Sequence, residues 1–252
     1  MTPSTPIVSK AIVTGHTRGL GAALSEALLA RGFTVLGVSR TRHTSLAARF
    51  PDSVEEAEVD LADTQNIEAW LASGALQQFL RGADRVLLIN NAGTAEPIGS
   101  LDALNAREVG RSVVLNVAAP LMLSCAFAEA SKEASDRRIA HVSSGAARNA
   151  YEGWSVYCAT KAALDHHARA VTLGHEPALH IATIAPGVVD TAMQAALRET
   201  DQAAFPSRDK FIELQRSGKL TPPQQAAEKF VDYLLSAGFG EAATVDLRDL
   251  PS

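Results

Sequence analysis

Cysteine is scarce in this sequence of 252 residues, and no pattern of metal ligands is visible. Cys125 and Cys158 are the only cysteines, and each lies in a segment with helical periodicity. Two cysteines make no metal-binding pattern, so we expect reduced thiols, no metal site and a cytoplasmic protein. His166, His167 and His175 have no third ligand in view, and we place them on the outer parts of a helix.

Long apolar runs and an excess of basic charge are also missing. No apolar run approaches the roughly 20 residues that a membrane span requires. The N-terminal segment MTPSTPIVSK lacks the basic start and apolar stretch of a secretion signal. The net charge of −5 argues against a nucleic-acid-binding surface. We therefore expect a soluble protein that binds neither membranes nor nucleic acid.

No linker rich in proline, glycine or serine divides the chain, so we predict one domain over residues 1–252. Apolar β-rich runs alternate with helical stretches, which predicts an α/β fold with a doubly wound parallel sheet of about seven strands. The expected strands are residues 11–14, 34–39, 55–59, 85–90, 139–143, 180–185 and 244–247. The clearest expected helices are residues 20–31, 66–80, 157–173 and 222–237.

The alternation breaks at residues 188–220, a long polar insertion before the last expected helix. Segments of this size without obvious strands are often active-site lids. We therefore predict that residues 188–220 form a substrate-side insertion, with Met193, Gln194 and Leu197 at its start as a lid.

A glycine triplet follows the first expected strand. Gly15, Gly19 and Gly21 stand in TGHTRGLG, just before a helix. Glycines there let the backbone turn tightly and approach a pyrophosphate, whose charge then faces the helix N-terminus. A strand–helix turn that merely requires glycine is the alternative, and we favour nucleotide binding because of the position.

The residues after the second expected strand favour NADP over NAD. An NAD site usually places an acid there to bind the ribose hydroxyls, yet residues 27–51 contain none. The strand instead ends in Ser39 and Arg40, followed by Arg42, and Arg18 lies in the glycine loop. A 2′-phosphate requires cationic, fork-shaped donors, although arginines are also common on any surface.

Polar residues follow the third and fourth expected strands, at the edge of a parallel sheet where ligands bind. Asp60 precedes Leu61 and is a candidate acceptor for an adenine amino group, and Asn91 and Gly93 are candidates for backbone contact with a cofactor. Each is also a residue type that loops use for geometry alone.

Tyr157 and Lys161 lie four residues apart in a helical pattern, so their side chains share a face. A nearby ammonium stabilises a phenolate and is expected to lower the pKa of the tyrosine. Such a tyrosine can protonate a carbonyl oxygen while hydride reaches the carbon. Tyr151 has no cation at this spacing and is expected to form a pocket wall.

Ser144 and Asn116 are candidate helpers of Tyr157. Ser144 follows the fifth expected strand, where a hydroxyl can donate to a developing oxyanion. Asn116 lies inside an apolar helix, where an amide needs a partner or a water. The alternatives are a turn cap for Ser144 and a satisfied core amide for Asn116.

Taken together, these residues resemble the short-chain dehydrogenase/reductase superfamily over nearly the whole chain. The matching motifs are TGHTRGLG at 14–21, NNAG at 90–93, Asn116, Ser144, YCATK at 157–161 and APGVVDT at 185–191. The resemblance implies a Rossmann-type fold with a catalytic tetrad of Asn116, Ser144, Tyr157 and Lys161, with Asn116 anchoring a relay water. It implies that NADPH or NADP is held by Gly15, Thr17, Arg18, Gly19, Leu20, Gly21, Ser39, Arg40, Asp60, Leu61, Asn91, Ala92, Gly93, Tyr157, Lys161, Pro186, Gly187, Val189 and Thr191.

Within the superfamily, the stretch from SSGAARNAYEGW to YCATKAA, APGVVDTAMQ and TVDLRDL is similar to sepiapterin reductases and benzil reductases. This similarity implies an NADPH-dependent reductase of a vicinal diketone or an α-hydroxyketone. Asp246 matches an aspartate that anchors the pterin in sepiapterin reductases, but benzil reductases keep an acid there too. Open alternatives are a general carbonyl or 3-ketoacyl reductase and a non-catalytic NADP(H)-sensing protein.

The expected substrate residues are Ser144, Tyr151, Trp154, Tyr157, Met193 and Asp246. Tyr151 and Trp154 precede the catalytic helix and are suited to wall an aromatic substrate, although ordinary packing explains large side chains equally well. The resemblance also implies a homodimer or homotetramer, with the helices at 102–132 and 154–175 as the seam.

Overall fold

The structure is a computed structural model, and it describes residues 7–174, 176 and 178–250. Seven parallel strands form one sheet in the order β3-β2-β1-β4-β5-β6-β7. The strands are β1 Ser9–Thr14, β2 Thr34–Ser39, β3 Val54–Glu58, β4 Arg85–Asn90, β5 Asp136–Val142, β6 Leu179–Ala185 and β7 Thr244–Asp246. The helices are α1 Gly19–Ala30, α2 Leu46–Arg49, α3 Thr64–Ala72, α4 Ala75–Leu80, α5 Ala106–Val113, α6 Ala119–Ala130, α7 Ser155–Thr172, α8 Ala192–Glu199, α9 Arg208–Arg216 and α10 Pro223–Leu235. The predicted α/β doubly wound sheet is therefore confirmed.

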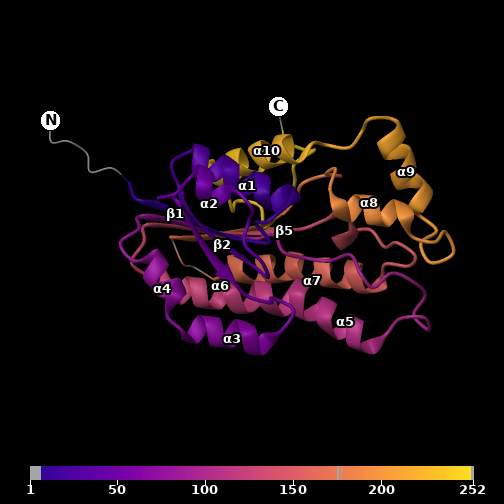
Figure 1. Ribbon diagram of the computed structural model, residues 1–252, viewed down its shortest axis with the longest axis horizontal. Coiled ribbons are helices and arrows are strands. Elements are labelled where there is room, and N and C mark those ends of the chain that lie inside the picture. Colours follow the sequence, from indigo (N-terminus) through magenta and orange to yellow (C-terminus); the bar gives the residue numbers. More distant parts are fainter. Residues whose placement is uncertain (1–6, 175, 177, 251–252) are drawn as a thin grey trace.

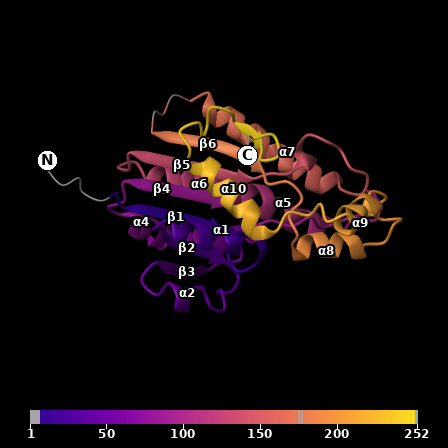
Figure 2. The ribbon, with the colours of Figure 1, turned by 90° about the horizontal axis from the view of Figure 1, so that it is seen from above.

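The order of the strands reverses between β1 and β4, which are direct neighbours (Figure 2). All seven expected strands are present, with ends that differ by up to three residues. In a doubly wound sheet, ligands bind beyond the carboxyl ends of the strands at the reversal point. The loops after β1 and β4 therefore lie where a cofactor site is expected.

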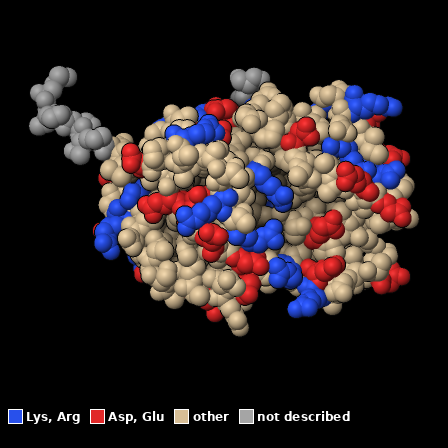
Figure 3. All heavy atoms as spheres, viewed as in Figure 1, with Lys and Arg blue, Asp and Glu red and all other residues tan. Residues whose placement is uncertain are grey.

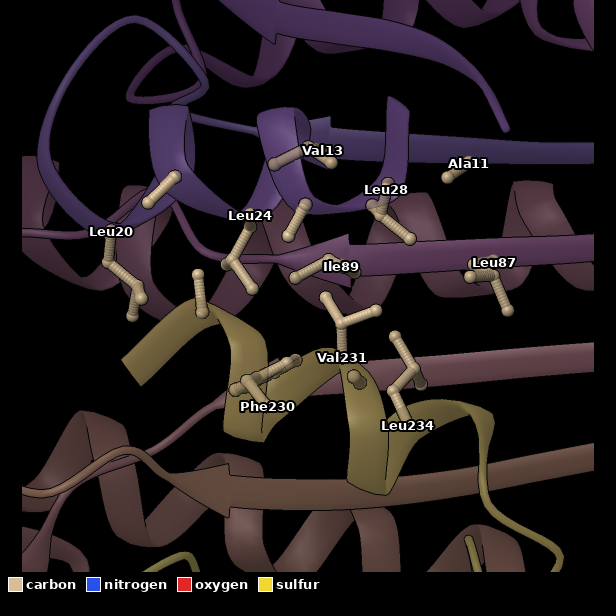
Figure 4. Packing of buried hydrophobic residues seen from close by; sticks show 14 of the residues in the cluster. Ala11, Val13, Leu20, Leu24, Leu28, Leu87, Ile89, Phe230, Val231 and Leu234 are labelled. Carbon is tan, nitrogen blue, oxygen red and sulfur yellow. The ribbon is translucent and has the colours of Figure 1, made fainter. Parts of the chain in front are cut away.

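Helices α1 and α10 cover one face of the sheet, as Figures 1 and 2 show. Alternate residues of β1 and β4 point toward this layer, and Figure 4 shows their packing against the two helices. The labelled side chains are Ala11, Val13, Leu20, Leu24, Leu28, Leu87, Ile89, Phe230, Val231 and Leu234. Because a strand alternates its side chains between faces, the intervening residues of β1 and β4 are buried on the opposite side.

The opposite face is covered by α3, α4, α6 and α7 (Figure 1). The expected helix at 66–80 is two helices, because Gly74 adopts a φ of 77° between α3 and α4. Phe127 of α6 is fully buried in this second layer. The two layers hold the sheet rigidly, so its carboxyl edge can position side chains from distant parts of the chain.

Helices α5 and α6 are joined by a π-helical turn, Val114–Ala118, into one continuous helix. Contrary to the sequence expectation, this helix, Ala106–Ala130, is long and apolar enough to cross a membrane by length and composition, with a mean hydropathy of 1.7 over its most apolar 18 residues. A helix packed on the core of a globular protein passes the same test. Leu123 and Phe127 pack in the layer beneath the sheet, so part of the apolar sequence of this helix belongs to the core.

The insertion at 188–220 contains α8 and α9, which extend beyond the carboxyl edge of the sheet (Figure 1). Its two ends are tied together, because the backbone N–H of Asp190 donates to Thr221 at 2.9 Å and that of Thr221 to Val188 at 2.9 Å. Leu197 and Phe211 anchor the two helices to a third apolar cluster, which also contains Trp154 and Tyr157. The insertion therefore packs against the N-terminal end of α7.

Candidate active site

A cleft of about 1490 Å³ opens at the carboxyl edge of the sheet. Figure 3 shows a hollow on this face of the molecule with basic side chains around it. Every expected cofactor and substrate residue lines the cleft, and so do Ser144, Tyr157 and Lys161. Of the expected tetrad, only Asn116 lies outside the lining. Motifs separated by more than two hundred residues thus meet around one space, from Gly15 to Asp246.

The glycine loop has a shape that only glycine permits. Gly15 and Gly19 have φ angles of 68° and 55°, in the left-handed region. A Cβ on Gly21 would lie 2.2 Å from the carbonyl oxygen of Gly15 and 2.5 Å from Nδ2 of Asn91. The backbone from Gly15 to Gly21 therefore carries no side chain at its three glycines. This glycine cradle fits the pyrophosphate of a dinucleotide.

Replacing Gly21 with alanine is expected to abolish cofactor binding, because the new methyl group must displace the backbone of the loop at Gly15. We expect the affinity for NADPH to fall at least about 100-fold, measured by fluorescence titration. Gly110→Ala is the matched control, since Gly110 is an exposed helical glycine with nothing within 4 Å of the added Cβ. That variant should bind NADPH normally and unfold at the same or a higher temperature. Tight NADPH binding by Gly21→Ala would show that the cradle is not the binding site.

Asn91 and Thr14 join the loops after β4 and β1. Nδ2 of Asn91 donates to the carbonyl oxygen of Thr14 at 2.8 Å, and the hydroxyl of Thr14 accepts from the backbone N–H groups of Asn91 and Ala92, each at 2.9 Å. The side chain of Asn91 therefore stabilises the glycine loop. Its backbone and that of Gly93 remain along the cleft, where the prediction placed them.

Asp60 lies in the cleft lining but already has partners on both oxygens. Oδ1 accepts from the backbone N–H of Ala62 at 3.0 Å, and Oδ2 pairs with Nη2 of Arg111 at 3.2 Å. An adenine amino group would therefore share this carboxylate with Arg111, a residue for which the sequence gave no signal.

The basic residues after β2 divide into two groups. Arg40 and Arg18 line the cleft, as expected for a 2′-phosphate site. Arg42 points elsewhere and pairs with Glu58 at 3.0 Å. The hydroxyl of Ser39 donates to the carbonyl oxygen of Thr41 at 2.5 Å, which holds the turn that carries Arg40.

Tyr157 and Lys161 are both buried on one face of α7. The Nζ atom of Lys161 lies 5.8 Å from the centre of the Tyr157 ring, and it donates to the carbonyl oxygen of Val142 at 2.7 Å. Burial raises the pKa of Tyr157 to about 12, with the Ser144 hydroxyl acting in the opposite direction. The expected lowering of this pKa is therefore wrong for the protein alone, because desolvation of the buried phenol outweighs the lowering by the Ser144 hydroxyl.

Burial also lowers the pKa of Lys161 to about 8, and the neighbouring carboxylate of Asp165 opposes this shift. An ammonium group that loses water becomes harder to charge. Lys161 therefore changes its charge much closer to neutral pH than an exposed lysine does.

Ser144 stands just past the end of β5 and begins a short 3₁₀ turn, Gly145–Ala147. Its hydroxyl oxygen accepts from the backbone N–H of Ala146 at 3.2 Å, so the turn-cap alternative holds. Because the oxygen is the acceptor in this bond, the hydroxyl hydrogen remains available to a group in the cleft. A cap and an oxyanion donor are compatible in one residue.

Asn116 sits in the π-helical turn, fully enclosed by protein. Its Nδ2 donates to the carbonyl oxygen of Thr94 at 2.8 Å and to Oγ1 of Thr160 at 3.2 Å, and its Oδ1 accepts from the backbone N–H of Thr94 at 2.9 Å. The side chain of Asn116 is therefore a core amide with hydrogen-bond partners on both its oxygen and its nitrogen, which was the alternative to a role beside Tyr157. Through Thr94 and Thr160, Asn116 links the loop after β4 to α7, and it thereby supports the position of Tyr157.

Asp165 is a residue that the sequence reasoning missed. It lies one turn beyond Lys161 on α7, is almost fully buried, and accepts from the hydroxyl of Ser143 at 2.6 Å and from Nε of Arg148 at 3.2 Å. Asp165 therefore holds Ser143, which precedes Ser144, and Arg148, which follows it. Its spacing of four from Lys161 was the available signal, because residues four apart share a helical face.

Part of the cleft has an aromatic wall. Trp154 is buried, and its ring centre lies 4.8 Å from those of Tyr157 and Phe205. Tyr151 packs edge-on against Trp154 at 5.6 Å, and Nζ of Lys210 in α9 lies 5.2 Å from the centre of the Tyr151 ring. Tyr151 and Trp154 therefore line the cleft, as predicted, and Trp154 also packs against other aromatic rings, as the packing alternative holds.

Asp246 reaches the cleft from the end of β7, but its carboxylate is occupied. Nε and Nη2 of Arg248 donate to its two oxygens at 2.9 and 2.6 Å. This hydrogen bonding from Arg248 holds the pKa of Asp246 below its usual range. A substrate with an amidine-like edge would therefore compete with Arg248 for Asp246.

His167 is half-buried, although the sequence predicts that the histidines lie on the outer parts of the helix. Its Nδ1 lies 3.1 Å from Nε2 of His141, which is fully buried on β5, and burial lowers the pKa of both rings, that of His141 to about 3. His166 is exposed, as expected. His175 lies outside the described residues.

The architecture of the cleft agrees with the chain's similarity to known proteins. A family profile described as short chain dehydrogenase matches residues 9–202. The chain therefore belongs to the short-chain dehydrogenase family and is an oxidoreductase by that membership.

Several characterised proteins are similar to this chain over almost their whole length. A benzil reductase ((S)-benzoin forming) of Bacillus cereus is 34% identical over 244 residues, covering 93% of this chain and 98% of that protein. A sepiapterin reductase of Xenopus tropicalis is 31% identical over 254 residues, covering 94% and 95%. A crystal structure of a short-chain dehydrogenase/reductase from Burkholderia vietnamiensis is 52% identical, with a TM-score of 0.70, and the match covers 96% of this chain and 98% of that one.

Proposed function

We propose that this protein is an NADPH-dependent carbonyl reductase that acts on aromatic vicinal diketones or α-hydroxyketones. The observation that carries the proposal is the meeting of Ser144, Tyr157 and Lys161 with the glycine cradle in one cleft. The similarity to benzil and sepiapterin reductases supports the substrate class. The basic pair Arg18 and Arg40, together with the absence of acids from residues 27–51, supports NADPH over NADH.

The cradle and the loops after β2, β3 and β4 would hold the cofactor, with Thr191 and Lys161 toward the nicotinamide end. Bound NADPH supplies the hydride for reduction. Tyr157 stays protonated at neutral pH because of its raised pKa, so its hydroxyl proton is available to the carbonyl oxygen of the substrate. The ammonium of Lys161 stabilises the phenolate as that proton leaves, and the Ser144 hydroxyl donates to the same substrate oxygen.

The substrate end of the cleft favours a neutral aromatic diketone over a pterin. Trp154 and Tyr151 offer an aromatic wall, and the carboxylate of Asp246 is already bound by Arg248. An aromatic substrate gains contact with the wall, whereas a pterin must first displace a guanidinium from Asp246. We therefore expect benzil to be a better substrate than sepiapterin. In this proposal, residues 188–220 cover the substrate.

A substrate panel tests the proposal. Purified protein is mixed with NADPH or NADH and with benzil, sepiapterin or an acetoacetyl thioester, and the loss of reduced-cofactor absorbance is followed. We expect the highest kcat/KM for benzil with NADPH. A higher kcat/KM for the acetoacetyl thioester would identify a general ketoacyl reductase. Tight NADPH binding without turnover of any of these carbonyls would identify a cofactor sensor.

We further propose that the protein works in the cytoplasm as a homodimer or homotetramer. Both cysteines are free thiols, which suits a reducing compartment. The long apolar helix Ala106–Ala130 is only 33% buried within one chain over its most apolar window, and burial of this surface against a second copy would remove it from water. Size-exclusion chromatography with light scattering measures the oligomeric state.

A further inference from the structure

A buried histidine–glutamate pair lies directly behind the glycine loop. His16, between Gly15 and Thr17, is fully buried, and its Nε2 lies 2.6 Å from Oε1 of Glu56 on β3. The imidazole packs on Gly37 of β2, where an added Cβ would come within 2.4 Å of the ring. The glycine loop is thus joined to the outer part of the sheet by one side chain.

The same oxygen of Glu56 also holds the loop that follows β2. Oε1 accepts from the backbone N–H of His43 at 2.6 Å. The His43 ring in turn accepts, through Nδ1, from the backbone N–H groups of Ser45 at 3.2 Å and Leu46 at 3.0 Å, at the start of α2. A single carboxylate therefore fixes two loops that are separated by more than twenty residues.

These two loops carry the basic residues of the cleft. Arg18 belongs to the glycine loop, and Arg40 belongs to the loop after β2. The spacing between the two guanidinium groups depends on how the loops are held. His16 and Glu56 are the buried link between the loops, because both side chains are nearly inaccessible to water. Although burial acts to raise the pKa of Glu56, the hydrogen bonds from His16 and His43 keep it below its usual value, so the carboxylate is charged.

We propose that the His16–Glu56 pair is a positioning element for cofactor choice, which holds Arg18 and Arg40 at the separation that fits a ribose 2′-phosphate. The inference rests on the proposed use of NADPH. Neither His16 nor Glu56 lines the cleft, so neither touches the cofactor. Loss of the pair loosens the loop after β2, and this weakens the binding of ligands that carry the 2′-phosphate.

Calorimetric titration of 2′,5′-ADP and of ADP into the protein tests the positioning role of the His16–Glu56 pair without turnover. We expect Glu56→Ala to weaken the binding of 2′,5′-ADP by about tenfold and that of ADP by less than twofold. Correspondingly, the KM for NADPH should rise while the KM for NADH and both kcat values change little. Glu56→Gln keeps an oxygen acceptor and should restore most of the affinity for 2′,5′-ADP.

Glu55→Ala is the matched control, because Glu55 is the preceding residue of β3 and is exposed. If Glu56→Ala fails to fold by circular dichroism, His16→Ala serves as the second variant, with the same selective loss expected. Equal weakening of 2′,5′-ADP and ADP, or no change in either, would overturn the positioning role. A wild-type protein that binds both nucleotides equally would instead contradict the NADPH preference of the proposed function.

Discussion

The Tyr157→Phe variant is expected to lose about 10²–10⁴-fold in kcat for benzil reduction while it binds NADPH normally. The substitution removes the hydroxyl and keeps the ring that packs on Trp154. The free energy of unfolding should change little, or increase, because a buried phenol loses a polar group. Stopped-flow assays give kcat, and fluorescence titration gives the affinity for NADPH.

The other two tyrosines of the chain provide the controls. Tyr233→Phe removes a hydroxyl on α10 whose pKa is also raised by burial, but Tyr233 does not line the cleft. It should leave kcat unchanged. Tyr151→Phe keeps the aromatic wall and should change kcat by no more than a few-fold. If Tyr157→Phe retains wild-type turnover, another group donates the proton and the proposed mechanism fails.

Replacing Lys161 with methionine is expected to lower kcat/KM by about 10²–10³-fold, because the phenolate forming on Tyr157 then has no cation beside it. In the wild-type protein, the ammonium is present below its pKa of about 8 and is lost above it. The kcat/KM should therefore be constant on the acid side of this value and fall by about tenfold per pH unit on the alkaline side. Tyr157, with a pKa of about 12, does not titrate in this range.

The matched variant is Lys161→Arg, which keeps a cation that does not titrate near pH 8. Its residual activity should lack the alkaline decline. Stability gives a second readout, because the folded-state pKa of Lys161 lies below its unfolded value of 10.5. The cost of burying the ammonium is present below pH 8 and disappears between about 8 and 10.5, so Lys161→Met should raise the melting temperature at pH 7 and raise it less at pH 10. An alkaline decline that persists in Lys161→Arg would assign the titration to another group.

The regular alternation of apolar strands and helices was sufficient to predict the sheet. β1, β4 and β6 read as nearly continuous apolar runs because parallel strands are buried on both faces, and the structure places all three inside the sheet. The ends of the elements were less certain. Helix α3 stops before Gly74, and β5 begins at Asp136, because local caps and turns decide where an element ends.

The candidate site could be predicted where spacing along one element fixes geometry. Tyr157 and Lys161 share a face of α7 because helical residues four apart always do. The glycines of 15–21 were identifiable because Gly15 and Gly19 have a left-handed backbone that favours glycine, and because the loop leaves no room for a Cβ at Gly21. Such features depend on neighbours in the chain, and the sequence contains them completely.

The partners of the site residues could not be predicted, since they come from distant elements. Arg111 binds Asp60 and Thr94 binds Asn116, and neither pair has a local pattern. The same holds for His16, whose position in the glycine loop gave no indication of its contact with Glu56 across the sheet. Hydrogen bonding between remote segments depends on the packing of the whole sheet.

The sequence by itself determined the fold class, the family motifs and the order in which the site residues reach the carboxyl edge of the sheet. The tertiary structure decided the electrostatics. The spacing of Tyr157 and Lys161 predicts a lowered phenol pKa, yet enclosure by α7, Trp154 and the insertion helices raises it to about 12. Burial depends on every element packed around a group, and for Tyr157 the desolvation of the phenol outweighs the lowering of its pKa by the Ser144 hydroxyl.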